Sequence, residues 1–118
     1  MKRAVVLIIF LLFVGCSHKG ELKQIQLSAI PQMTTNLFQT AQPALRDAAF
    51  QAASLVAKGH YPQAWQMYQG LSMHPDLNEQ QKQFVGEAVA TLGKKVSEMA
   101  ANGDRLARRM LQRNLMNK

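Results

Sequence analysis

Cys16 is the only cysteine in this 118-residue chain, and it directly follows twelve apolar or small residues, 4–15. With a single thiol, the chain can form neither an intramolecular disulfide nor a cluster of thiolate ligands around a metal. Hydrophobic residues make up 47% of the chain and charged residues 18%, which is typical of a globular rather than a disordered protein. A domain this small must therefore be stabilised by its own helix packing or by a partner.

The first fifteen residues have the organisation of an export signal. Lys2 and Arg3 form a short basic start, an apolar segment follows, and the small residue Gly15 precedes Cys16. A helix over residues 4–15 would be about 18 Å long, whereas the hydrocarbon layer is roughly 30 Å thick, so the segment is too short to span a membrane. We therefore predict a signal peptide over residues 1–15, cleaved from the mature chain.

The run FVGCS, residues 13–17, resembles the lipobox of bacterial lipoproteins. The resemblance implies that Lys2, Arg3 and Gly15 serve signal recognition, and that the thiol of Cys16 carries a diacylglycerol after cleavage. The new N-terminus would also be acylated, with palmitate as the expected chain, and the lipid would anchor the protein permanently. Ser17 is similar to the residue found in lipoproteins of the Gram-negative outer membrane, which implies that location, and we expect the domain to face the periplasm, although Ser17 itself carries no information on the side. The alternative is an ordinary cleaved signal with a coincidental cysteine.

Residues 16–42 contain the lipidated cysteine and a segment rich in Gln, Ser and Thr. The segment includes Pro31 and has no sustained hydrophobic period. Such a composition is typical of a linker. We predict a flexible tether that connects the lipid anchor to a folded domain beginning at residue 43.

A helical pattern begins at Pro43, a residue favoured in the first turn of a helix, and Gly59 is a suitable stop. The first apolar stripe is mostly alanine, which lets another helix approach closely, and contains Leu45, Ala48, Ala49, Ala52, Leu55 and Val56. A second helix starts near Pro62, and its apolar face contains Tyr61, Ala64, Trp65, Tyr68, Leu71 and Ser72. The two segments predict an antiparallel helical hairpin, with the aromatic residues mainly in the core.

The run AASLVAKGHYPQAWQMY, residues 52–68, resembles the middle of a tetratricopeptide repeat. The positions that match the repeat are Ala52, Gly59, Tyr61, Ala64 and Tyr68. The resemblance implies a helical hairpin that presents a groove to a peptide or an envelope protein. Because one repeat cannot bury its own two faces, we predict a tetratricopeptide-like hairpin rather than a repeat array.

A third helix is predicted after Asn78 or Asp76, either of which has a capping-box partner three residues later. Its apolar face contains Phe84, Val85, Ala88, Val89, Leu92, Val96 and Met99, and the run ANG at 101–103 ends it. The predicted fold is therefore all-α, with a helical domain over residues 43–103. Together with the C-terminal segment, it would contain three to four helices.

Residues 104–118 are predicted to form a basic amphipathic helix. Residues 17–93 hold five Lys or Arg and five Asp or Glu, whereas residues 94–118 hold seven and two, so the positive excess is at the end. On a helical wheel one half is apolar and the other carries Arg105, Arg108, Arg109 and Arg113. The arginines either contact an anionic surface, such as lipid headgroups, lipopolysaccharide phosphates or an acidic protein, or are solvated while the apolar half docks on the third helix. We favour docking.

No pattern of residues indicates catalysis. His18, His60 and His74 are scattered without metal-ligand spacing, and no phosphate loop or zinc motif is present. We therefore expect no enzymatic activity, no metal and no cofactor, and no nucleic-acid partner for a chain anchored outside the cytoplasm.

The predicted function is a small helical protein–protein interaction module of the bacterial envelope, attached to the membrane by its lipid. The alternative is a structural envelope protein that contacts peptidoglycan or an anionic membrane surface through the basic C-terminal helix. A second copy of the chain is a further possible partner, because so short a domain offers little surface for its own core.

Overall fold

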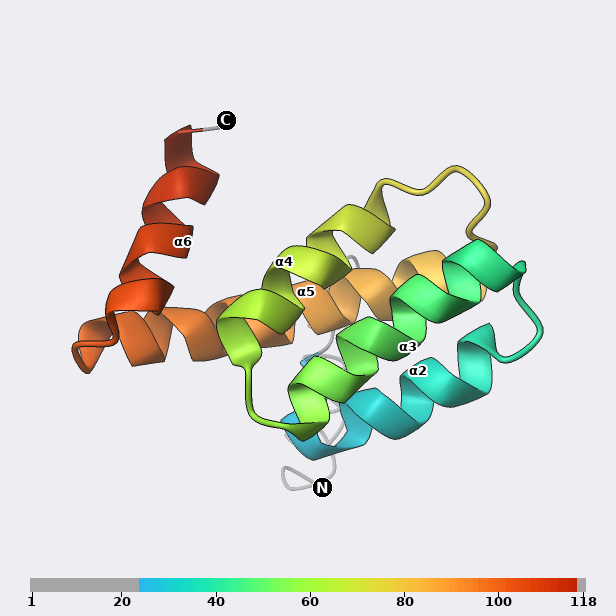
Figure 1. Cartoon of the computed structure of the whole chain (residues 1–118), viewed down its shortest axis with the longest axis horizontal. Helices are drawn as coiled ribbons and strands as arrows, with labels where there is room; N and C mark the ends of the chain where they lie inside the picture. Colours follow the sequence, from blue (N-terminus) through green and yellow to red (C-terminus); the bar gives the residue numbers. More distant parts are fainter. Residues whose placement is uncertain (1–23, 117–118) are drawn as a thin grey trace, which may run out of the picture.

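The computed structural model describes residues 24–116, and every regular element in that range is helical (Figure 1). The elements are a 3₁₀ turn, η1 (Leu27–Ala29), and five α-helices: α2 (Ile30–Phe38), α3 (Pro43–Ala57), α4 (Tyr61–Ser72), α5 (Glu79–Ala101) and α6 (Arg105–Met116). The all-α prediction is confirmed for this part of the chain. The predicted signal peptide and Cys16 lie outside the described residues.

Residues 24–42 are folded, which corrects the prediction of a flexible tether there and of only three to four helices. Ile30, Thr34 and Phe38 of α2 are spaced four residues apart and have no exposed surface. Before this helix, the backbone N–H of Ile25 donates a hydrogen bond to Thr91 Oγ1 of α5, at 3.1 Å. Pro31 lies in the first turn of α2, where a missing N–H costs nothing. Residues 16–23, the remainder of the predicted tether, lie outside the described range.

The helices lie side by side in chain order over most of the molecule. Contacts join α2 to α3, α3 to α4, α4 to α5, and α5 to α6. The chain reverses direction between α3 and α4 (Figure 1). The long helix α5 crosses the molecule, and its last turns extend beyond α3 and support α6 (Figure 1).

The ends of the helices follow from local sequence signals. Gly59 and Gly103 have positive φ angles, 80° and 100°, and end α3 and α5 in a conformation that other residues rarely adopt. Of the two predicted caps for α5, Asn78 is the one used. Its side chain accepts the Gln81 N–H at 2.8 Å, while Gln81 Oε1 accepts the Asn78 N–H at 2.9 Å.

The core combines small residues at helix contacts with a few aromatic rings. Ala49, Ala52, Ala64 and Ala88 have no exposed surface, which allows neighbouring helices to pack closely. The larger core residues include Phe38, Trp65, Tyr68 and Phe84, and the rings of the last two meet edge to face with centroids 6.3 Å apart. Trp65, Tyr68 and Phe84 are buried as predicted, whereas Tyr61 is only half-buried.

Candidate functional site

An open groove separates α4 from α6. Helix α4 lies along α5, α6 rises from the C-terminal end of α5, and the two helices diverge towards their own C-terminal ends (Figure 1). Between them lies a cavity of about 210 Å³ lined by Trp65, Gln66, Gln69, Met110, Arg113 and Asn114. We call this cavity the α4/α6 groove.

Helix α6 is held mainly at its start. Asp104 Oδ1 accepts the N–H of Ala107 at 2.9 Å, and the Ala107 side chain is fully buried. Arg108 Nε donates to the carbonyl of Ala100 at 3.1 Å, an acceptor at the end of α5 that also receives the N–H of Gly103. These contacts fix where α6 leaves α5 and how it is tilted.

The second half of α6 is attached more loosely. Gln69 Nε2 donates a hydrogen bond to Asn114 Oδ1 at 3.1 Å, and this bond joins α4 to α6. Leu115 and Met116 are 69% and 84% exposed, so the apolar half of the helix docks over its first turns only. The favoured prediction, docking on the third helix, therefore holds for the start of α6.

The four arginines of α6 are all exposed. Arg113 lines the groove and Arg108 is bonded to the end of α5, whereas Arg105 and Arg109 do not line the groove. Among residues 24–116 none of the four makes an ion pair, since the two that are present join Arg46 to Asp47 and Lys82 to Glu79. Their contact with an anionic surface stays a prediction.

The facing wall of the groove, α4, has no charged residue between Tyr61 and Ser72. Helix α6 has four arginines and no acidic residue between Arg105 and Met116. The groove therefore has one neutral wall and one cationic wall.

Trp65 forms the apolar base of the groove. Its side chain is 6% exposed, and its Nε1 is buried without a hydrogen-bond partner in the described part of the chain. A Cβ atom added at Gly93 of α5 would lie 3.1 Å from that nitrogen. The indole therefore lies against α5 at a position where the absence of a side chain makes room for it.

Gly93→Leu is expected to lower the free energy of unfolding by roughly 1–3 kcal/mol, because the new side chain must displace the indole of Trp65. Gly70→Leu is the matched control: a Cβ at that helical glycine meets nothing within 4 Å. There the better helix propensity of leucine should leave stability unchanged or raise it by up to about 1 kcal/mol. Urea unfolding followed by circular dichroism measures both variants. Equal effects at the two positions would contradict the close contact between Gly93 and Trp65.

A second polar group is buried away from the groove, between α2 and α4. The hydroxyls of Thr34 and Tyr68 are 2.6 Å apart, and the Thr34 hydroxyl donates to the Ile30 carbonyl at 2.7 Å. The single hydroxyl hydrogen of Thr34 is thereby used, so the Tyr68 O–H donates to Thr34. Burial raises the pKa of Tyr68 to about 12. The pair is a structural link between the two helices.

No cluster of metal-ligating side chains is present in residues 24–116. No three His, Cys, Asp or Glu side chains in that range are grouped so that they could hold a metal ion. His74 has a local role, since its Nδ1 accepts the N–H of Asp76 at 3.2 Å, and His60 is exposed. Within the same range, no helix combines the length and the apolar character needed to cross a bilayer.

The structure brings Arg113 alone, of the site residues predicted from the sequence, into the groove. Lys2, Arg3, Gly15 and Cys16 lie outside the described residues. The polar groove residues on α4 and Asn114 were missed, and the signal for Asn114 was its place in the middle of the apolar half of α6.

Comparison of the chain with protein-family models, curated proteins and solved structures finds no match.

Proposed function

We propose that this chain is a lipid-anchored protein of the bacterial envelope whose helical domain binds another protein through the α4/α6 groove. The observation that carries the proposal is the groove itself. It is concave and combines an apolar base with polar side chains, a combination typical of binding sites. The absence of a catalytic motif from the sequence favours binding over chemistry.

The lipid anchor is part of the same proposal. It rests on the run FVGCS and on the apolar segment before it, which together resemble a lipoprotein signal. Ser17 favours the outer membrane, and the domain would face the periplasm. Mass spectrometry of the purified protein tests this directly, because lipidation adds a diacylglycerol and an acyl chain to a chain that begins at Cys16. A mature chain that starts elsewhere, or carries no lipid, would contradict the anchor.

We also propose that α3 and α4 form a single tetratricopeptide-like hairpin. Three features support it: Ala52 and Ala64 are fully buried, Tyr68 is fully buried, and Gly59 has a φ of 80° in the turn. A lone repeat needs other elements to cover its faces, and here α2 packs on α3 while α5 packs on α4. Such hairpins commonly serve as binding scaffolds.

In-cell photocrosslinking tests the binding function. A photoreactive residue at Gln66, which is exposed and lines the groove, should give one adduct of defined mass. The control position is Gln51, an exposed residue of the same type on α3, which does not line the groove. A protein adduct from Gln66 and not from Gln51 supports the groove as a recognition surface. Adducts from neither position, or the same adducts from both, would contradict it.

The alternative function, contact with peptidoglycan or an anionic membrane surface, is favoured by a different observation. Arg105 and Arg109 are exposed on α6 and make no ion pair in the described residues. A structural protein of this kind should remain with the sacculus after boiling in detergent, or give only lipid, lipopolysaccharide or peptidoglycan adducts. An interaction module should be released by the same treatment.

A further inference from the structure

We propose that the α4/α6 groove binds an acidic segment of the partner protein, with a carboxylate against Arg113 and an apolar side chain against Trp65 and Met110. This inference rests on the proposed binding function and specifies the chemistry of the partner. It follows from the donors in the groove, from the charge of its walls and from the exposed apolar residues at its open end.

The polar side of the groove presents hydrogen-bond donors. Asn114 Oδ1 accepts a hydrogen bond from Gln69, whereas the Nδ2 amide of Asn114 donates to no group in the described residues and can bond an occupant. Arg113 is exposed, lines the groove and makes no ion pair in residues 24–116. A guanidinium beside a free amide matches a carboxylate, whose two oxygens only accept hydrogen bonds.

The apolar side of the groove is formed by Trp65 and Met110. A tryptophan face and a flexible thioether accept aliphatic or aromatic side chains of varied shape. A cavity of about 210 Å³ has room for a few side chains rather than for a whole helix. The occupant is therefore a segment that inserts neighbouring acidic and apolar side chains.

Charge argues against a second copy of this chain as the occupant. Helix α4 has no charged residue, α6 has four arginines and no acid, and Asp104, directly before α6, uses an oxygen to cap the helix. Two copies that met through this face would bring their positively charged α6 helices together, whereas an acidic segment would complement the positive charge of α6. Electrostatic complementarity thus selects a different, acidic protein.

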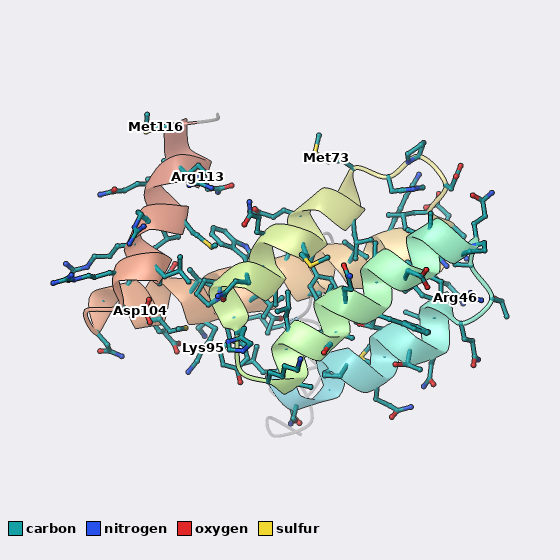
Figure 2. All side chains as sticks on the ribbon, viewed as in Figure 1. Arg46, Met73, Lys95, Asp104, Arg113 and Met116 are labelled. Atoms are coloured by element: carbon teal, nitrogen blue, oxygen red, sulfur yellow. The ribbon has the colours of Figure 1, made fainter. Side chains whose placement is uncertain are left out.

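The exposed apolar residues extend the same surface. The large hydrophobic side chains left exposed in residues 24–116 are Met73, Leu115 and Met116, at 84%, 69% and 84%. Figure 2 places Met73 at the end of α4 and Met116 at the end of α6, on the same edge of the molecule. Each lies within about one helical turn of a groove residue, Gln69 or Asn114, so an occupant longer than the groove would cover them.

A flat anionic membrane is the competing partner, and the shape of the site disfavours it. Arg113 lies in a concavity, where a planar headgroup layer makes poor contact. Arg105 and Arg109, which are exposed and do not line the groove, are the arginines that a flat surface would reach. The two partners therefore predict different dependence on individual arginines.

The test uses the full-length chain in phosphatidylcholine vesicles and the fluorescence of Trp65, the chain's only tryptophan. The probe is a water-soluble helical peptide of Glu and Leu without aromatic residues, and the control peptide has Gln in place of Glu. We expect a saturable change in emission with the acidic peptide and at least tenfold weaker binding of the Gln peptide. Equal affinity for both peptides, or no response to either, overturns the proposal.

Two single-charge variants locate the contact. Arg113→Gln is expected to weaken binding of the acidic peptide at least tenfold, and Arg105→Gln, which removes the same charge from an exposed position outside the groove, less than threefold. Equal losses would mean that the general charge of α6 attracts the peptide, and the groove assignment would be wrong. A response to phosphatidylglycerol vesicles without a response to the peptide would instead assign the site to membranes.

Failure of this inference can be told apart from failure of the proposed function. If Arg113→Gln protein carrying the photoreactive residue at Gln66 still captures the same partner in cells, the binding function stands and the acidic recognition is wrong. If the unaltered protein captures no partner at that position, the proposed function itself is wrong.

Discussion

Phe38→Ala is expected to lower the free energy of unfolding by about 3–5 kcal/mol, the usual cost of removing a fully buried aromatic ring. Phe38 has no exposed surface and belongs to α2, within the segment that the sequence suggested was a tether. Small domains have total stabilities of roughly 5–15 kcal/mol, so this loss is a large part of the whole. Urea unfolding followed by circular dichroism at 222 nm provides the measurement.

The control for Phe38 is its neighbour Gln39, which is exposed and makes no side-chain hydrogen bond in the described structure. Gln39→Ala should change stability by less than about 0.5 kcal/mol. If Phe38→Ala were as mild as Gln39→Ala, α2 would not be part of the cooperative core. The segment would then behave as a tether despite its helical backbone.

Alkaline pH is expected to destabilise the domain through Tyr68. Burial raises the pKa of its phenol to about 12 in the folded state, from the ordinary tyrosine value of about 10. The neutral phenol is thus favoured by folding, so its contribution is complete below pH 10 and is lost as the pH rises towards 12. Two pKa units correspond to about 2.7 kcal/mol, or about 1.4 kcal/mol for each pH unit across that window. Urea unfolding from pH 8 to pH 11 should show this slope, and Tyr68→Phe should remove it.

A Tyr68→Phe protein with the same alkaline slope as the unaltered chain would show that other groups cause the loss. Thr34→Val provides an independent check at neutral pH. It leaves the buried Tyr68 hydroxyl without its partner, which should cost about 1–3 kcal/mol. The double variant should be more stable than the sum of the two single effects predicts, since it removes both hydroxyls together.

The sequence predicted α3, α4, α5 and α6 because each combines a sustained apolar period with a clear signal at its ends. Pro43 and Pro62 lie in first turns, Gly59 and Gly103 end helices, and Asn78 caps α5. These signals act within a few residues of one another, so no knowledge of the tertiary structure is needed to interpret them.

Helix α2 was missed because its apolar stripe is short, lies in a segment rich in Gln, Ser and Thr, and is interrupted by a buried polar residue. Thr34 lies between Ile30 and Phe38 on that face, and is satisfied by the Ile30 carbonyl and the Tyr68 hydroxyl. The apolar residues Ile30, Met33, Leu37 and Phe38 do recur at helical spacing, and Met33 and Leu37 pack against the core, but the stripe covers only nine residues. Tyr68 is 34 residues away in the sequence. The burial of Thr34 therefore follows from a tertiary contact that the local pattern does not contain.

The groove was beyond sequence reasoning for a similar reason. A helical wheel shows which half of α6 is apolar, but not how much of that half is covered. Coverage depends on the direction in which α6 leaves α5, which is set by Gly103, by the Asp104 cap and by the burial of Ala107. Because of that direction, the first turns of α6 pack on α5, whereas the C-terminal end of α6 projects away from it (Figure 1).

The folding of α2 also sets how far the domain can stand from a membrane. The chain joins the folded body at Ile25, so a lipid on Cys16 would be separated from Gln24 by eight residue steps, or at most about 29 Å. In Figure 1 α2 begins at the lower edge, whereas α4 and α6 end at the upper edge. A chain anchored at Cys16 would therefore keep the start of its domain close to the bilayer, while the α4/α6 groove lies at the edge of the domain opposite the point of attachment.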